Sequence, residues 1–221
     1  MSQKKTFVCF ANSRKEGGQC VVGKEKTDSG YAWIRPVGDG SKGELSNLEI
    51  GYDGRVGGAK PKFLDVVEIV VKERKFHAYQ KENWLIDNNY CWKKKGECRQ
   101  DRVRDLVDAP KSLWAIDCSS RRGTSDRIPY KDVQSSVRQS VYLVRADDVR
   151  LFCSQVGRTP QLRAAFSYKG TPYNLAVTDP IEDDFMVGES QCLSAAYLCV
   201  SLSEPFRHHV YKLVAGIMEL E

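Results

Sequence analysis

The sequence predicts a mainly β protein with a few short helices, built from two five-stranded barrels in tandem. About ten short segments are rich in β-branched and aromatic residues and are separated by turn signals, which is typical of small barrels and sandwiches. Few stretches have the periodicity of a helix. The charge also changes sign along the chain near residue 141. A single mixed sheet is the alternative that these observations leave open.

Four strands are predicted in the first 80 residues or so, counting by runs of β-branched and aromatic residues. They are Lys5–Phe10, Gln19–Lys24, Tyr31–Val37 and Phe63–Val71. Turn signals at Gly17-Gly18 and Asp28-Ser29-Gly30 separate the first three. The stretch from Gly38 to Lys62 is rich in Gly, Lys and Asp, and we expect a long excursion there.

Arg99–Val107 is the best helix candidate, because Val103, Leu106 and Val107 share one face while arginines occupy the others. The remaining predicted strands are Leu113–Ile116, Tyr142–Arg145, Val149–Cys153, Leu162–Tyr168, Tyr173–Thr178, Ala195–Leu202 and Val210–Met218. Lys169-Gly170-Thr171-Pro172 predicts a hairpin turn.

The charge split predicts the domain boundary. Residues 1–141 hold 27 Lys and Arg against 19 Asp and Glu, whereas residues 142–221 hold 7 against 10. We therefore predict a basic N-terminal barrel with long insertions over 1–141 and an acidic C-terminal barrel over 142–221. The first would meet a polyanion such as nucleic acid or a nucleotide, and the second would be scaffold or a surface for a protein partner. Ordinary solvated lysines are the alternative.

No run of about 18 apolar residues occurs, so no transmembrane helix is expected, and the N-terminus does not have the pattern of a signal peptide. Eight cysteines, several of them in apolar runs, indicate reduced thiols in a cytoplasmic protein. Cys91, Cys98, Cys192 and Cys199 with His208 and His209 could supply metal ligands. Their seven-residue steps fit no standard zinc site, so we expect no metal and no cofactor.

Two polar stretches that follow strand-like runs, Ala11–Cys20 and Phe76–Ile86, combine cations, amides and aromatic rings. Cations neutralise phosphates, aromatic rings stack on bases, and amide side chains can read a base edge. The predicted binding residues are Arg14, Lys15, Trp33, Arg35, His77, Tyr79, Gln80, Asn83 and Trp84. We expect Trp84→Ala with Arg35→Ala to abolish binding and leave the fold intact. The alternative is that Phe76, Tyr79 and Trp84 plug one end of a barrel.

Two further function classes stay open. In an enzyme, His77 and Glu82 could form an acid–base pair, with Cys20 or Ser13 as nucleophile. The sequence lacks a full P-loop pattern, which argues against nucleotide hydrolysis, and a cysteine inside a strand is typical of a core. In a pure interaction module, the acidic second half and the loop Ser203–His209 would form the partner surface.

Several motifs, in order, carry a resemblance to a known family. They are Asn12-Ser13-Arg14-Lys15, Gly17-Gly18, Cys20-Val21, Trp33-Ile34-Arg35-Pro36-Val37, Leu64–Ile69, His77–Trp84, Ser112-Leu113-Trp114, Val177-Thr178-Asp179-Pro180, Tyr197–Pro205 and Tyr211–Ala215. With them the chain resembles the prokaryotic dual OB domain-containing proteins, where OB stands for oligonucleotide/oligosaccharide-binding. The resemblance implies two OB-like barrels and a nucleic-acid or nucleotide role, within anti-phage defence or mobile-element systems. It implies no particular reaction, because a fold is not a function.

Overall fold

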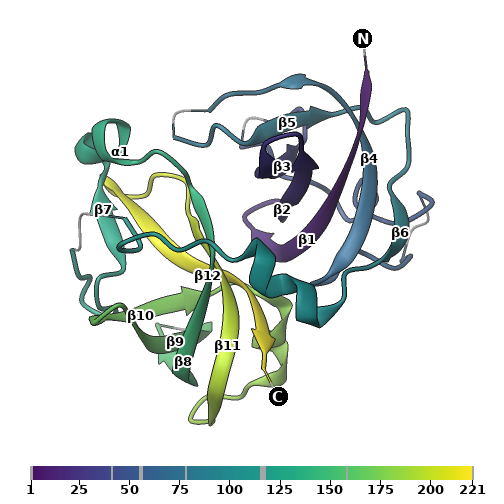
Figure 1. Ribbon diagram of the computed structural model, residues 1–221. Coiled ribbons are helices and arrows are strands. Elements are labelled where there is room, and N and C mark those ends of the chain that lie inside the picture. The colour runs from purple at the N-terminus through teal and green to yellow at the C-terminus, as the bar shows by residue number, and fades with distance from the viewer. Residues whose placement is uncertain are drawn as a thin grey trace. The chain divides into compact units, whose positions relative to one another are not determined.

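The computed structural model describes residues 2–40, 42–54, 57–77, 79–114, 118–157 and 159–220 (Figure 1). The chain divides into two compact units, Met1–Leu106 (unit 1) and Val107–Glu221 (unit 2). Both are built on strands, as predicted. In the part of the chain that the structure describes, no helix is long and apolar enough to cross a membrane.

Unit 1 contains a closed barrel whose strands pair in the order β1-β2-β3-β5-β4, with β4 returning to β1. Its strands are β1 (Gln3–Lys15), β2 (Gly18–Thr27), β3 (Gly30–Val37), β4 (Asp65–Arg74), β5 (Asn83–Ile86) and β6 (Lys93–Glu97). The β3–β5 pair is parallel and the other neighbours in the barrel are antiparallel. Strand β6 adds to β4 outside the closed ring.

The interior of this barrel follows from the alternation of side chains along each strand. In β4, Val67, Ile69 and Val71 are buried, whereas Glu68 and Val70 between them are only half-buried. Buried residues from the other strands join them, and Trp92 packs edge-on against Phe7 at a centroid distance of 6.4 Å. A barrel closed in this way has a single apolar core.

The predicted excursion after β3 also contributes to this core. Leu45, Ile50 and Tyr52 from that segment are buried. The Tyr52 hydroxyl donates a hydrogen bond to the Asp65 carboxylate at 2.7 Å, and Lys94 on β6 lies 2.7 Å from the same carboxylate. Burial, together with this hydrogen bond, raises the pKa of Tyr52 above its ordinary value.

The predicted helix over Arg99–Val107 is confirmed in place, as the 3₁₀-helix η1 (Gln100–Leu106). Its buried residues are Val103 and Leu106, as its apolar face predicted. Lys24 on β2 donates a hydrogen bond from Nζ to the Leu106 carbonyl oxygen at 2.6 Å. The C-terminal end of η1 is thereby attached to the barrel.

Unit 2 repeats the same barrel with β8-β9-β10-β12-β11, closed by the β8–β11 pair and containing one parallel pair, β10–β12. Its elements are β7 (Arg127–Pro129), α1 (Tyr130–Ser136), β8 (Val141–Val156), β9 (Thr159–Tyr168), β10 (Thr171–Val177), η2 (Pro180–Asp184), β11 (Ser190–Leu202) and β12 (His209–Glu219). The chain therefore forms two barrels in tandem and not a single mixed sheet. The hairpin predicted at Lys169–Pro172 joins β9 and β10.

Several details differ from the sequence-based expectations, and β6, β7 and α1 were not predicted. The predicted strands Tyr142–Arg145 and Val149–Cys153 form one continuous strand, β8. Strand β5 was not predicted, because it has only four residues and opens with Asn83. Leu113 and Trp114 form no strand, and Ala115 and Ile116 lie outside the described residues.

The structural division at Leu106 also lies earlier than the boundary at 141 that the charge split suggested. Residues 107–141 pack with unit 2: β7 pairs with β12, and the buried side chains of Leu113, Val133 and Val137 belong to this segment. Apolar burial and strand pairing decide where a compact unit ends, and surface charge does not enter that decision.

Candidate functional site

One end of the unit 1 barrel brings together the two polar stretches that the sequence singled out. The β1–β2 turn, the end of β3 and the β4–β5 loop all lie there. Arg35 on β3 donates from Nη1 to Cys20 Sγ at 3.7 Å, and its backbone N–H donates to the Glu82 carbonyl oxygen at 2.9 Å. We call the described residues 14–20, 35–40, 42–45, 74–77 and 79–83 the loop end of unit 1. In five-stranded barrels of the OB type, the β1–β2 and β4–β5 loops flank the ligand.

Contacts between these loops hold the loop end together. Lys15 Nζ donates to the Lys42 carbonyl oxygen, and Lys42 Nζ lies 2.6 Å from the Glu16 carboxylate. Lys75 Nζ donates to the Gly38 carbonyl oxygen at 2.9 Å. The segment after β3 is therefore bonded both to the β1–β2 turn and to the start of the β4–β5 loop.

The structure buries six of the nine predicted binding residues. Arg35 forms an ion pair with Glu82 at 3.0 Å, and both side chains are less than 10% exposed. Asn83 Nδ2 donates to Gln80 Oε1 at 3.3 Å. The buried predicted residues are Trp33, Arg35, Tyr79, Gln80, Asn83 and Trp84. A side chain sealed in this way cannot meet a ligand unless the loop rearranges, so its binding role stays a prediction.

The two predicted tryptophans are covered by cations. Lys5 Nζ lies 4.2 Å from the Trp84 ring and Arg74 Cζ lies 4.5 Å from it. Lys24 Nζ lies 4.9 Å from the Trp33 ring. Each tryptophan thus contributes a cation–π contact to the fold. On the β3 face shared by Tyr31, Trp33 and Arg35, only Tyr31 is exposed.

The remaining predicted residues lie at the surface of the loop end. Arg14 and His77 are exposed and Lys15 is half-buried. Sequence reasoning considered Phe76 only as a plug of the barrel end and did not count it among the binding residues. In the structure Phe76 is 69% exposed, and Arg74 Cζ lies 6.0 Å from its centroid. The signal that could have found it is an aromatic residue beside cations immediately after a strand.

The side chains considered for catalysis are divided between the interior and the surface of unit 1. The Glu82 carboxylate is engaged by Arg35 in the interior, whereas His77 is exposed on the surface. Ser13 is buried and its hydroxyl donates to the Cys20 carbonyl oxygen at 3.4 Å. Within the described ranges, no three His, Cys, Asp or Glu side chains gather closely enough to hold a metal ion. All eight cysteines are free thiols.

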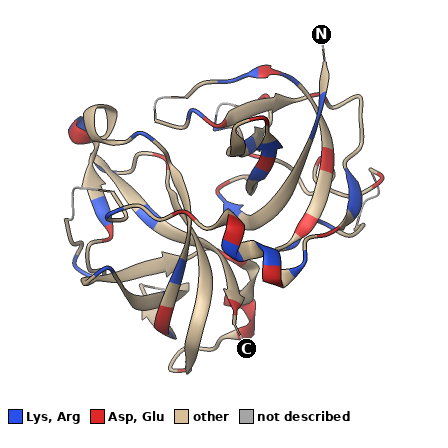
Figure 2. Ribbon diagram, in the orientation of Figure 1, with Lys and Arg blue, Asp and Glu red and all other residues tan. Residues whose placement is uncertain are grey.

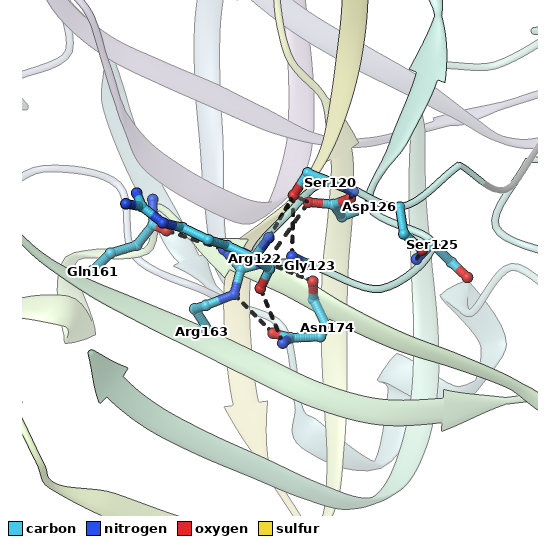
Figure 3. A network of polar contacts seen from close by, with 9 residues as sticks. Ser120, Arg122, Gly123, Ser125, Asp126, Gln161, Arg163 and Asn174 are labelled. Atoms are coloured by element: carbon cyan, nitrogen blue, oxygen red, sulfur yellow. Dashed lines mark hydrogen bonds and ion pairs between the residues drawn. The ribbon is translucent and has the colours of Figure 1, made fainter. Parts of the chain in front are cut away.

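Unit 2 contains a buried polar network that fixes a surface loop (Figure 3). Arg163 on β9 donates to Asn174 Oδ1 at 2.8 Å and to Gln161 Oε1 at 3.0 Å, and lies 3.8 Å from the Asp126 carboxylate. Burial lowers the pKa of Arg163 below its ordinary value, and the Asp126 charge opposes that shift. Asp126 in turn accepts hydrogen bonds from the Ser120 hydroxyl at 2.6 Å and backbone N–H at 2.7 Å.

The network leaves room for only a glycine at position 123. A Cβ on Gly123 would collide with the Asp126 carboxylate and the Arg163 guanidinium. The backbone of Thr124 pairs with that of Asn174 on β10. The loop Ser119–Asp126 is therefore held against β9 and β10, while Arg121 and Arg122 at its tip are exposed.

Comparison with known proteins finds one matching family and a set of distant solved structures. A family model described as "Dual OB-containing domain" matches residues 5–217. No curated protein matches the sequence at a significant level.

Among solved structures, the chain is similar to the tetrameric p202 HIN2 domain, with 9% identity, a TM-score of 0.34 and coverage of 99% of this chain and 92% of the other. It is also similar to a murine DNA binding protein bound to double-stranded DNA, with 10% identity, a TM-score of 0.34 and full coverage of both chains. The Ifi202 HINa domain in complex with double-stranded DNA has 7% identity, a TM-score of 0.35 and coverage of 95% and 90%. At these TM-scores the likenesses carry no argument about this chain.

Proposed function

Because the chain belongs to the dual OB-containing domain family, we propose that it binds single-stranded nucleic acid, or a nucleotide, at the loop end of unit 1. The observation that carries this proposal is Phe76, a ring 69% exposed on the β4–β5 loop with Arg74 beside it. An exposed ring next to a guanidinium offers a stacking face and a phosphate partner together. The ligand class that fits both is a strand with unpaired bases.

Exposed cations at the loop end support the same proposal. Arg14 near the end of β1 and Lys81 on the β4–β5 loop are exposed. The exposed acidic residues nearest in sequence are Glu16, paired with Lys42, and Glu73. Phosphate neutralisation by such cations releases counterions, so binding would weaken as salt rises.

Substitution of Phe76 in the full chain tests the proposal. Affinity for fluorescently labelled oligo(dT) and oligo(U) of about 10 nucleotides would be measured by anisotropy at several salt concentrations. We expect Phe76→Ala to weaken binding about tenfold or more, since stacking on one ring contributes about 1–3 kcal/mol.

The matched control is Tyr90→Ala, which removes another exposed ring (54%) from the segment after β5, at the other end of that strand. It should leave affinity unchanged. Equal affinities for the wild type and Phe76→Ala would refute the site, and equal losses in both variants would show that binding is not localised.

A second candidate function, binding of a protein partner by unit 2, has one observation in its favour. Ile181, Asp184, Phe185, Glu189, Ser190 and Gln191 line an open pocket of about 500 Å³. Beside it, β11 pairs with β8 from Ser190 onward, whereas its pairing with β12 starts only at Ala196 among the described residues. An open strand edge next to an acidic, partly apolar pocket suits an extended basic peptide that adds as a strand.

Calorimetry with a peptide of alternating Lys and Leu residues tests this candidate. We expect binding that Asp184→Lys weakens at least tenfold and that N-methylation of the peptide backbone abolishes, because strand addition needs main-chain hydrogen bonds. Asp28→Lys, an exposed charge change in unit 1, is the control. Binding that tolerates N-methylation would contradict the strand-addition mode.

A place in the cytoplasm and a role in prokaryotic defence remain expectations from the sequence.

A further inference from the structure

The two barrels are equivalent strand for strand, which makes two of their loops equivalent as well. In unit 1 the parallel partner of β3 is β5, and in unit 2 the parallel partner of β10 is β12. β4 and β11 each pair with the first strand of their own barrel. The β11–β12 turn of unit 2 therefore occupies the topological position that the β4–β5 loop occupies in unit 1.

That turn presents the same three kinds of side chain. Phe206 is 58% exposed, and Arg207 Cζ lies 5.2 Å from its ring centroid. His208 is exposed. In unit 1 the corresponding side chains are Phe76 and its neighbours Arg74 and His77. Each barrel thus exposes a phenylalanine, an arginine beside it and a histidine on the loop between its last two barrel strands.

The unit 2 turn holds two bulky residues in a left-handed backbone conformation. Phe206 and His209 exchange backbone hydrogen bonds at 2.7 and 3.1 Å, so Arg207 and His208 are the two central residues of a tight hairpin turn. Both have positive φ, 47° and 64°. Turns of this kind favour Asn and Gly at those positions. Bulky residues held in this conformation are characteristic of functional sites.

Neighbouring side chains extend the turn into a larger aromatic and basic surface. The Tyr211 ring lies 6.5 Å from both the Phe206 ring and the His209 ring. On the adjoining strand β7, the half-buried Arg127 is the register partner of Tyr211. Tyr130, the first residue of α1, is 38% exposed and donates its backbone N–H to the His208 carbonyl oxygen at 2.8 Å. This strand continues directly from the loop that the Arg163 network fixes (Figure 3).

We propose that the turn Phe206–His209, with Tyr211 and Arg127, is a second binding site for single-stranded nucleic acid. The proposal rests on the function proposed for unit 1, because it assigns the same ligand chemistry to the equivalent loop of unit 2. An exposed ring stacks on a base, and Arg207 and Arg127 supply phosphate contacts. The protein would then bind two short strands at once. One longer strand would bind both sites only if the nucleotides between its two bound segments are long enough to span them.

Stoichiometry in the full chain tests the second site. Calorimetric titration with oligo(dT) of about 10 nucleotides is made at concentrations at which a site weakened tenfold stays largely empty. It is expected to give two bound strands per wild-type chain and one for either Phe206→Ala or Phe76→Ala. The double variant should bind none. Phe206→Trp, which keeps a stacking ring, should retain two. Met186→Ala, which removes a side chain 71% exposed elsewhere in unit 2, is the control.

The outcomes separate this proposal from the one on unit 1. If Phe206→Ala changes neither stoichiometry nor affinity, the second site is wrong, whatever Phe76→Ala does. If Phe206→Ala loses one strand and Phe76→Ala loses none, the second site stands and the unit 1 site fails. Because Phe206 is largely exposed, its replacement should not affect folding, and an unchanged melting temperature would verify that.

Discussion

At the scale of single residues, Arg35 and Glu82 show how a side chain suited to a ligand can serve the fold instead. The sequence favoured Arg35 as a phosphate partner, since it lies on a strand with Tyr31 and Trp33. In the structure its guanidinium lies 3.0 Å from the Glu82 carboxylate, and both groups are buried. Its partner comes from a segment far along the chain, so no local pattern reveals the pair. A combined Arg35→Ala and Trp84→Ala variant would therefore remove core contacts along with any binding.

Glu82→Gln tests this structural role. We expect it to lower the free energy of unfolding by about 3 kcal/mol or more, because the Arg35 charge stays buried without its counter-charge. Arg35→Met with Glu82→Met should recover most of that loss, since a buried ion pair can often be replaced by apolar residues of similar volume.

Urea denaturation provides both free energies, and anisotropy on the double variant shows whether Arg35 contacts nucleic acid. If the double variant is as stable as the wild type but no longer binds nucleic acid, Arg35 belongs to the binding site. A single variant as stable as the wild type would contradict the role described here.

At the scale of elements, η1 was predictable and its attachment was not. The spacing of Val103 and Leu106 predicted both the helix and its buried face. The contact that completes it, from Lys24 Nζ to the Leu106 carbonyl oxygen at 2.6 Å, joins residues 82 positions apart. Figure 2 shows residues of both charge signs along this helix, and they are exposed, which suits a solvated surface. By contrast, β5 was missed because four residues are too few for a periodic pattern to be visible.

Lys24→Met should loosen η1 from the barrel. Methionine keeps the apolar stem over Trp33 but leaves the Leu106 carbonyl oxygen without its buried donor, a loss of about 1–3 kcal/mol. Trypsin should then cleave faster after Arg102 and Arg104, which are exposed on η1.

Lys26→Met on the same strand is the control, because Lys26 is exposed. It should leave the cleavage rate after both arginines unchanged. Comparable rates in the wild type and Lys24→Met would show that the hydrogen bond does not hold the helix.

At the scale of the whole molecule, one strand order is used twice, and the two copies differ in charge. Residues 1–106 carry 21 Lys and Arg against 15 Asp and Glu, whereas residues 107–221 carry 13 against 14. The basic character predicted for the N-terminal part therefore survives the change of boundary. Because unit 2 is nearly neutral, its attraction for nucleic acid would come from localised cations, such as those around Phe206. The net charge of the whole unit would contribute little.

The amino-acid sequence by itself determined the β class, most strand positions, the turns between them and the two polar stretches at strand ends, because these depend on neighbouring residues. Only the tertiary structure decided which side chains of those stretches face solvent. Alternation along a strand defines two faces, but closure of the barrel selects which one lies inside. The parallel β3–β5 pairing that draws Asn83 and Trp84 into the wall and leaves Phe76 outside joins segments far apart in the chain.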